Sequence, residues 1–308
     1  MLFVRVQIGK FRFRALWRKL LDYTCCFSPV LLLFRGLRRR GRGGNRSGGM
    51  MLRIAQIKVY PQRGDCAANQ ARLMELLARV AAHQPDVVIT PECFLDGYIA
   101  DSDTPADALL RYAVSPDTAP EVAAVRAWAA AHQCWVIKGC MRRAAGGVYN
   151  SALVINRDGH LVGHYDKTHL QTHDLKFLAG QSLPVFASDF GPFGVLICAD
   201  RRWPETVRTL ALQGARIILN PTYGMHGDFN RSMMQVRSWE SEIVIAFTHP
   251  AQALITGPRG EIIRDNADLE DSFVITEVDL DVVDTCRAAP SAHLRDRRPD
   301  LYFPAGKA

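Results

Sequence analysis

The sequence lacks the features by which several large classes of protein are recognised. Its eight cysteines form no C-x-x-C pair, so their spacing indicates neither a zinc site nor a disulfide framework. No glycine-rich loop runs into Lys-Ser or Lys-Thr, no internal repeat is evident, and no apolar run is long enough to span a bilayer. What remains is a globular composition, with 308 residues, 48% hydrophobic and 22% charged. We expect a cytoplasmic protein whose cysteines are reduced and mostly buried.

Residues 1–49 differ in charge from the rest of the chain. They hold twelve Lys and Arg and a single acid, Asp22, so they contribute +11 to the total of +7 and leave residues 50–308 at −4. We expect a basic disordered extension, or upstream sequence included by a wrong start choice, because Met50 and Met51 directly precede the first strand pattern. A membrane or nucleic-acid anchor is an alternative for this segment alone. Residues 50–308 are expected to form one domain that binds neither a membrane nor a nucleic acid.

From Leu52 onward, strand patterns alternate with helical ones. Two hairpins interrupt the alternation, one of them around Asp158-Gly159. This order predicts an α/β fold with a mixed sheet, or two sheets with helices outside, rather than a simple parallel sheet. The predicted strands are 52–59, 86–90, 135–141, 148–155, 161–166, 195–197, 216–220, 243–248, 253–256, 261–264 and 272–279. The predicted helices are 67–82, 118–132 (with a Thr118-x-x-Glu121 capping box), 204–213 and 230–241.

Three of the apolar strands end at a residue of a reactive type. Glu92 follows residues 87–90, Lys167 follows 161–166, and Cys198 follows 195–197. If these ends meet at one rim, Cys198 can attack an electrophilic carbon while Glu92 takes the thiol proton and returns it to a leaving amine. Lys167 would hold positive charge near the oxyanion.

Each of these residues also has a simpler interpretation. Taken singly, Glu92 and Lys167 more often form a salt bridge at a sheet rim or solvated strand ends, and a cysteine such as Cys198 more often packs in the core. Pro204 predicts a helix start shortly after Cys198, and a helix N-terminus there would lower the pKa of the thiol.

The same segments resemble those of a known family. Pro91-Glu92 with Gly97-Tyr98, then Tyr165 to Leu170, then Cys198 to Glu205 are similar to the three signature segments of the nitrilase (carbon–nitrogen hydrolase) superfamily. The resemblance implies a catalytic triad of Glu92, Lys167 and Cys198 and an α-β-β-α sandwich of two mixed sheets. It also implies homodimers that stack into four layers, and hydrolysis of a small-molecule substrate with no metal or organic cofactor.

Within the superfamily, Asp200-Arg201-Arg202-Trp203 is similar to the N-carbamoyl-amino-acid amidohydrolases. There the resemblance implies that Arg201 and Arg202 hold a substrate carboxylate; the alternative is that they pair with Asp200 or Glu205 and stiffen the turn. The chain departs from the pattern at Ala199, where that branch has Asn.

Further candidates for the site follow from the same resemblance and from their positions at strand ends. The chain has only Asp174 where many members carry a second Glu, so Asp174 is a candidate accessory acid. His169, Tyr98 and Tyr223 are further candidates for substrate contact.

We expect a thiol amidohydrolase for a small amide, ureido or N-carbamoyl compound that bears a carboxylate. The alternatives are a nitrilase that uses the same triad on a C≡N group, and a non-catalytic member that uses the fold as a dimeric binding module. The complete triad argues against the second alternative.

Overall fold

The computed structural model describes residues 51–101 and 103–302, and the predicted extension over residues 1–49 lies outside them. Two six-stranded sheets form the centre of this unit. The first has the order β12-β1-β2-β3-β4-β5 and the second the order β11-β10-β9-β8-β7-β6. The strands of the first sheet are β1 (Met51–Ile57), β2 (Val87–Ile89), β3 (Trp135–Ala144), β4 (Gly147–Ile155), β5 (Leu161–Asp166) and β12 (Phe273–Asp279). Those of the second are β6 (Val185–Phe186), β7 (Phe193–Val195), β8 (Ile217–Pro221), β9 (Val244–His249), β10 (Gln252–Thr256) and β11 (Ile262–Asn266).

Both sheets are mixed, as predicted, and both are built the same way. In the first sheet β1, β2 and β3 are parallel, and in the second β7, β8 and β9 are parallel. The remaining pairs are antiparallel. Parallel neighbours need a crossover connection, which a helix supplies. The four crossovers are α1 (Cys66–Ala81), α2 (Pro120–His132), α3 (Pro204–Leu212) and α4 (Asp228–Ser241).

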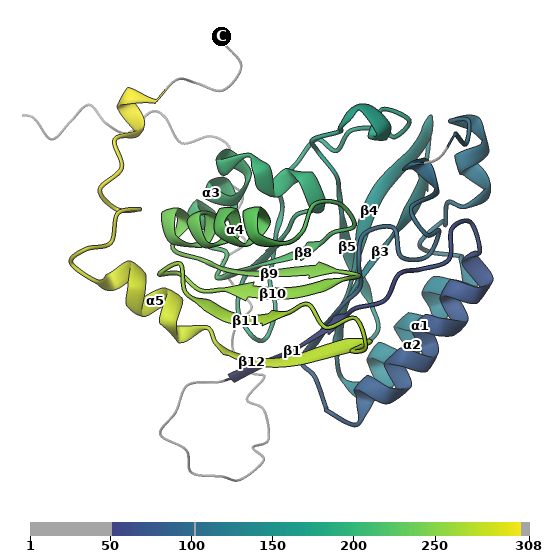
Figure 1. The fold of residues 1–308 in the computed structure, drawn as a ribbon, viewed down its shortest axis with the longest axis horizontal. Coiled ribbons are helices and arrows are strands. Elements are labelled where there is room, and N and C mark those ends of the chain that lie inside the picture. The colour runs from purple at the N-terminus through teal and green to yellow at the C-terminus, as the bar shows by residue number, and fades with distance from the viewer. Residues whose placement is uncertain (1–50, 102, 303–308) are drawn as a thin grey trace, which may run out of the picture. The chain divides into compact units, whose positions relative to one another are not determined.

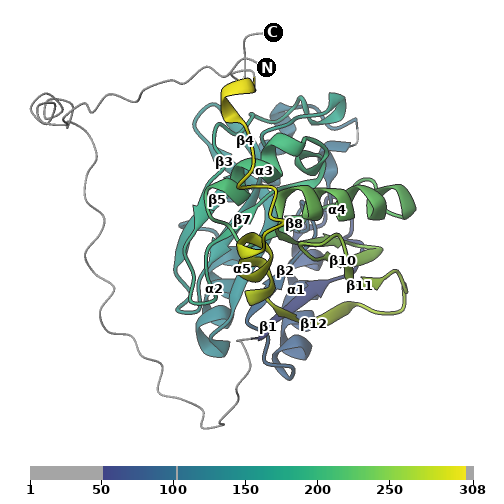
Figure 2. The same cartoon turned by 90° about the vertical axis from the view of Figure 1, so that its left-hand side faces the viewer.

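The helices cover the outer faces and the two sheets pack against each other. Figure 1 shows α1 and α2 together on one side and α3 and α4 together on the other, and Figure 2 gives the same unit from the side. The central core joins Ile54 and Val87 of the first sheet to Ile218 and Val244 of the second. A separate cluster packs Leu73 of α1 against the other face of the first sheet. The α-β-β-α sandwich is therefore confirmed, and its stacking into a four-layered homodimer stays a prediction.

The boundaries depart from the predicted ones in a few places. The start of α2 carries no side-chain cap: Ala119 is its N-cap residue, so the predicted capping box of Thr118 and Glu121 is wrong. Pro120 in the first turn instead presets the helical φ. The two-residue β6 and the helix α5 (Asp281–Ala288) were not predicted. Only Val283 of α5 is buried, which is too weak a periodic pattern to detect.

Candidate active site

Glu92 is buried between the sheets, three residues after β2 ends. Its side chain is 1% exposed, and each of its oxygens accepts hydrogen bonds. Asn150 Nδ2 lies 2.8 Å and Lys167 Nζ 3.0 Å from Oε1, and the backbone N–H of Tyr223 lies 3.0 Å from Oε2. Donors from three separate segments therefore hold this carboxylate in one orientation, in the acceptor-only form that a general base needs.

Lys167 directly follows β5 and is also fully buried. Its ammonium group lies 3.0 Å from Oε1 of Glu92 and 2.6 Å from Oδ2 of Asp174. Burial alone would lower the pKa of Lys167, but the charges of Glu92, Cys198 and Asp174 outweigh it and raise that pKa well above its usual range. Lys167 is therefore a fixed positive charge between two carboxylates.

Cys198 lies three residues beyond the end of β7 and begins a 3-10 turn, Cys198–Arg202. Its φ is +47°, in the left-handed region that side chains other than glycine seldom adopt. Such strained positions cluster at functional sites, because the surrounding structure must hold them. The turn separates the thiol from the start of α3 at Pro204.

The predicted lowering of the Cys198 pKa is wrong. Burial raises the pKa of the thiol and Glu92 raises it further, while Lys167, Arg201 and the backbone N–H of Gly224 oppose them. The helix dipole that the sequence suggested belongs to α3, which begins six residues later, and the effect decays within a turn. Cys198 thus rests as a thiol and needs a base, and Glu92 is close enough to influence its pKa.

The loop between β8 and α4 links Glu92 to Cys198. The N–H of Tyr223 holds the carboxylate, and the next residue, Gly224, lies against the sulfur. A Cβ atom at residue 224 would lie 3.2 Å from Sγ of Cys198, tighter than ordinary contact. A residue without a side chain is thus what this close approach requires.

Asp200 joins the segment after Lys167 to the Cys198 turn. Its buried carboxylate accepts hydrogen bonds from Tyr165 Oη at 2.8 Å and from Thr168 Oγ1 at 3.0 Å, and from the backbone N–H groups of His169 and Ile197. The alternative that Asp200 pairs with Arg201 or Arg202 is therefore wrong. Asp200 instead fixes the relative position of two of the three signature segments.

Arg201 is buried beside the thiol and directs its guanidinium group to protein acceptors. Nε donates to Asn230 Oδ1 at 2.8 Å, and Nη2 donates to the carbonyl of Met225 at 2.6 Å. Nη1 donates to the carbonyl of Cys198 and lies 3.7 Å from its Sγ. These four hydrogen bonds leave one of the five N–H groups for a substrate. Arg201 therefore ties the Cys198 turn to the loop that carries Gly224.

Arg202 ends the Cys198 turn and His169 lies in the segment after Lys167, and both are more open than Arg201. Arg202 is half-buried, and within the described part of the chain its side chain makes no hydrogen bond or ion pair. His169 places Nδ1 3.0 Å from Asp200 Oδ1 and stacks on Trp203, with ring centroids 4.2 Å apart. Of the two predicted arginines, Arg202 is thus the one free to meet an anion, and His169 mainly supports the turn.

Tyr98 and Tyr223 meet at the same end of the sandwich. Their rings stack with centroids 4.9 Å apart, and the Tyr98 hydroxyl donates to Oδ1 of Asp174 at 2.9 Å. Asp174 is fully buried, with one oxygen on Tyr98 and the other on Lys167. The predicted accessory acid therefore contacts the triad lysine directly.

Several residues of the site carry no signal in the sequence. Asn150 lies in the middle of β4, and its role appears only through its bond to Glu92. Asn230 lies in the first turn of α4, and Gly224 in the preceding loop. A residue type without charge or reactivity, distant in sequence, gives no motif to recognise.

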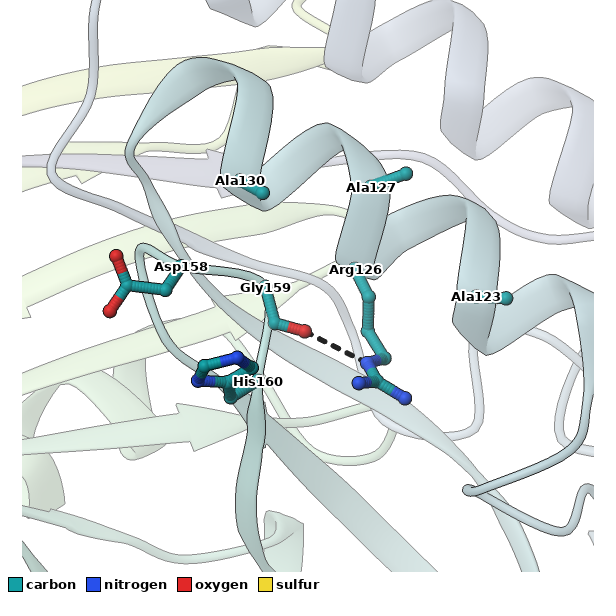
Figure 3. A pocket seen from close by; sticks show the side chains of 7 residues that line it. All are labelled: Ala123, Arg126, Ala127, Ala130, Asp158, Gly159 and His160. Atoms are coloured by element: carbon teal, nitrogen blue, oxygen red, sulfur yellow. Dashed lines mark hydrogen bonds between the residues drawn. The ribbon is translucent and has the colours of Figure 1, made fainter.

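Two surface depressions are lined by residues other than the triad. The larger, about 300 Å³, lies between α2 and the β4–β5 turn, where Arg126 donates to the carbonyl of Gly159 (Figure 3). The other, about 270 Å³, is lined by Tyr60, Lys58, Pro250 and Leu269, among others. Within residues 51–101 and 103–302, no cluster of three His, Cys, Asp or Glu residues could hold a metal ion. In the same residues no helix is long and apolar enough to cross a membrane.

Comparison with known proteins places the chain in a family. The family model for carbon-nitrogen hydrolases matches residues 52–288. The chain belongs to the carbon-nitrogen hydrolase family. A hydrolase in the pqqF 5′ region of Pseudomonas protegens is 31% identical over 83% of this chain and 92% of its own length. N-carbamoylputrescine amidase of Arabidopsis thaliana is 31% identical over 50% of this chain and 62% of its own length.

Solved structures support the fold of this carbon-nitrogen hydrolase. A carbon-nitrogen hydrolase from Helicobacter pylori superposes with a TM-score of 0.72 at 21% identity, covering 82% of this chain and 97% of the other. Its identity is too low to carry a substrate across, so it supports the sandwich architecture. Membership of the nitrilase superfamily, expected from the three signature segments, is confirmed, and the chain is a hydrolase by family.

Proposed function

We propose that this chain hydrolyses a non-peptide carbon–nitrogen bond of a small amide, ureido or N-carbamoyl compound, with Cys198 as nucleophile, Glu92 as general base and Lys167 as electrostatic stabiliser. The observation that carries the proposal is the buried Lys167 ammonium group bonded to both Glu92 and Asp174 at the side of a strained thiol. Burying charges this deeply costs solvation free energy, and buried, mutually paired titratable groups of this kind cluster at functional sites. Relatives named amidases agree with this reaction class.

In the first half of the reaction Cys198 forms a bond from Sγ to the carbonyl carbon while Glu92 accepts the thiol proton. The raised pKa of Cys198 makes this transfer necessary, because thiolate is scarce before attack. The carbonyl π electrons move to oxygen, and the ammonium group of Lys167 stabilises the resulting oxyanion. When the carbon–nitrogen bond breaks, Glu92 returns its proton to the nitrogen, and ammonia or an amine leaves a thioester on Cys198.

In the second half a water molecule attacks the thioester carbon. Glu92 takes one proton from the water, the carbon–sulfur bond breaks, and the proton returns to Sγ as the acid leaves. Lys167 again faces the oxyanion. The Asp174 carboxylate holds Lys167 throughout, so we assign it a positioning role, in place of the second Glu of many members.

The test is release of ammonia by purified protein from N-carbamoyl amino acids, ω-amides, ureides, simple amides and nitriles. We expect turnover of at least one amide or carbamoyl compound, and a loss on the order of 10⁴-fold or more in Cys198→Ala. Trapped acyl-enzyme should appear by mass spectrometry as an adduct on Cys198. Turnover by Cys198→Ala equal to wild type would refute the mechanism.

The nitrilase alternative uses the same triad, and the nitriles in the screen test it. Two relatives carry the name nitrilase, one of them from Pyrococcus abyssi. A nitrile preference would change the substrate class and leave the triad intact. A folded protein that turns over no compound of the screen would favour the non-catalytic binding member.

A further inference from the structure

A row of aromatic rings runs outward from the triad. Tyr98 stacks on Tyr223 with centroids 4.9 Å apart, and Tyr60 meets Tyr223 edge to face at 6.0 Å. His249 lies behind them, 6.1 Å from Tyr60, and His226 stacks on His249 at 4.3 Å. We call these five residues the ring row. They come from four separate segments, so only the fold brings them together.

The inner end of the ring row belongs to the site already described. Tyr98 bonds Asp174 through its hydroxyl, and Tyr223 bonds Glu92 through its backbone N–H. Gly224, the neighbour of Tyr223, lies against the Cys198 sulfur. A group attached to a carbon held at Cys198 therefore has aromatic surface beside it.

The outer end of the ring row is open. Tyr60 is 54% exposed, although it is a large aromatic residue. It also lines the depression of about 270 Å³ that contains Pro250 and Leu269. A cavity of about 150 Å³ already holds a benzene molecule. The outer end thus has room for a ring, and Tyr60 offers it an aromatic partner.

The charges around the ring row favour a neutral group. His249 accepts the N–H of Ala251 at Nδ1, so its Nε2 carries the hydrogen and donates to the carbonyl of Tyr223 at 2.7 Å. Burial lowers the pKa of His249 to about 4, with help from His226, so its ring is neutral at physiological pH.

Charges lie at both ends of the ring row. The outer depression is also lined by Lys58, Arg72 and Glu270. Lys58 Nζ donates to Asn266 Oδ1 and Arg72 pairs with Glu75, so both cations already have protein partners.

At the inner end of the ring row the charges are paired as well. The carboxylates of Glu92 and Asp174 are both bonded to Lys167, which leaves no free anion for a cation. The guanidinium group of Arg201 donates its hydrogen bonds to protein acceptors, so it attracts a substrate anion less strongly. Aromatic faces and edges, by contrast, attract another ring through offset-stacked and edge-to-face contacts.

We propose that the ring row binds the non-reacting end of the substrate, and that this end is a neutral aromatic ring. The inference deepens the proposed function and rests on it. The carboxylated substrate that Arg201 and Arg202 suggested is the competing proposal, and succinamate tests it.

The test compares amides that differ only at the far end: propionamide, 3-phenylpropionamide, 3-cyclohexylpropionamide, succinamate and 4-aminobutyramide. We expect 3-phenylpropionamide to have the highest kcat/KM. Tyr60→Leu should lower the ratio of its kcat/KM to that of propionamide about 2- to 10-fold, the range of one aromatic pair. Tyr302→Leu is the matched control, since Tyr302 is 50% exposed and packs on Arg297, and it should leave the ratio unchanged.

The substrate series distinguishes a failure of the ring row to bind an aromatic ring from a failure of the proposed amidase activity. Hydrolysis of propionamide with equal rates for the phenyl and cyclohexyl amides would overturn the ring row and keep the amidase. A preference for succinamate or 4-aminobutyramide would overturn the neutral ring in favour of an anionic or a cationic group. If no amide is hydrolysed, the binding of 3-phenylpropionamide to Cys198→Ala is measured by calorimetry. Binding that Tyr60→Leu weakens supports the ring row as the binding site. Absence of binding overturns it.

Discussion

The ammonium group of Lys167 lies 2.6 Å from Oδ2 of Asp174 and 3.0 Å from Oε1 of Glu92. The shorter contact is to the residue that the sequence singled out only as a possible substitute for a second Glu. Asp174 also accepts a hydrogen bond from the Tyr98 hydroxyl, which holds its carboxylate in place. Although its side chain is shorter than that of Glu, it reaches the lysine. The short 3-10 turn Thr172–Asp174 carries it there.

Removing the charge of Asp174 should impair the chemical step. In Asp174→Asn, Lys167 keeps one carboxylate neighbour instead of two, so its raised pKa should fall. We expect kcat to fall on the order of 10- to 100-fold with a smaller change in KM, and the alkaline limb of the kcat–pH profile to move to lower pH. Asp174→Glu is the control and should restore most of kcat. An unchanged pH profile in Asp174→Asn would show that Asp174 does not act through Lys167.

The two arginines of the Cys198 turn should separate by substrate. Arg201→Lys removes the bonds to Asn230 and Met225, so we expect kcat to fall for every substrate, on the order of 10-fold or more. Arg202→Ala should raise KM for carboxylated amides alone. Steady-state kinetics on propionamide and succinamate measures both. Equal KM increases on the two substrates in Arg202→Ala would contradict a carboxylate contact.

Gly224 should tolerate no side chain without a loss of rate. A Cβ atom there would lie 3.2 Å from the nucleophilic sulfur, so either the loop or the thiol must shift. We expect Gly224→Ala to fold and to lose about 10- to 100-fold in kcat, since misplacement of a reacting group by about 1 Å can cost 10²-fold. Gly146→Ala, in the β3–β4 turn, is the control for a general loss of stability: its φ of +85° strains the added side chain, but nothing lies near the added Cβ, so kcat should be unchanged. Wild-type kcat in Gly224→Ala would show that the thiol has more room than the structure gives it.

We expect Asp96, which is not part of the triad, to make the free energy of unfolding depend on pH. Burial raises the pKa of this carboxyl to about 7, against the opposing backbone N–H bonds from Ile99 and Met141. The folded state therefore holds the proton more tightly than the unfolded chain, where the pKa is about 3.9. The stability that this gives is complete below about pH 4 and is lost as pH rises through about 7.

Chemical denaturation between pH 5 and pH 8 tests this dependence. The free energy of unfolding of the wild type should contain a decline over this range, a few kcal/mol at most, that Asp96→Asn lacks. Asp107→Asn, an exposed carboxyl, is the control and should keep the wild-type slope. Identical slopes for wild type and Asp96→Asn would contradict a raised pKa at Asp96.

Much of the fold could be read from local patterns. The strand 161–166 was predicted with its observed bounds, and the hairpin at Asp158-Gly159 forms as expected, with Gly159 at a φ of +76°. Long amphipathic stretches such as α1 were found within a residue or two, because burial of one face sets their period. Short or weakly patterned elements such as β6 and α5 were not, because tertiary contacts alone stabilise them.

The residues of the site also differ in how far the sequence pointed to them. The sequence made Glu92, Lys167 and Cys198 candidates, because reactive residue types stand at the ends of three apolar strands and because their segments resemble the three signature segments of the family. The supporting groups were not: Asn150 on Glu92 and Asn230 on Arg201 are ordinary amides whose function depends on what they touch. The pKa of Cys198 was predicted in the wrong direction, because burial is a property of the packed chain.

By itself, then, the sequence determined the family through its three signature segments and the layered α/β architecture through the order and periodicity of its elements. The same segments led to the three side chains that we propose as the triad. Only the tertiary structure decided which charges meet. It placed Asp174 on Lys167, bonded Arg201 to Asn230, Met225 and the Cys198 turn, and brought the rings of Tyr98, Tyr223 and Tyr60 together. The ring pairs and the Glu92–Lys167 ion pair join residues 75 or more apart, and even the bond from Arg201 to Asn230 joins residues 29 apart on different elements. No local rule of sequence fixes a distance between two such segments.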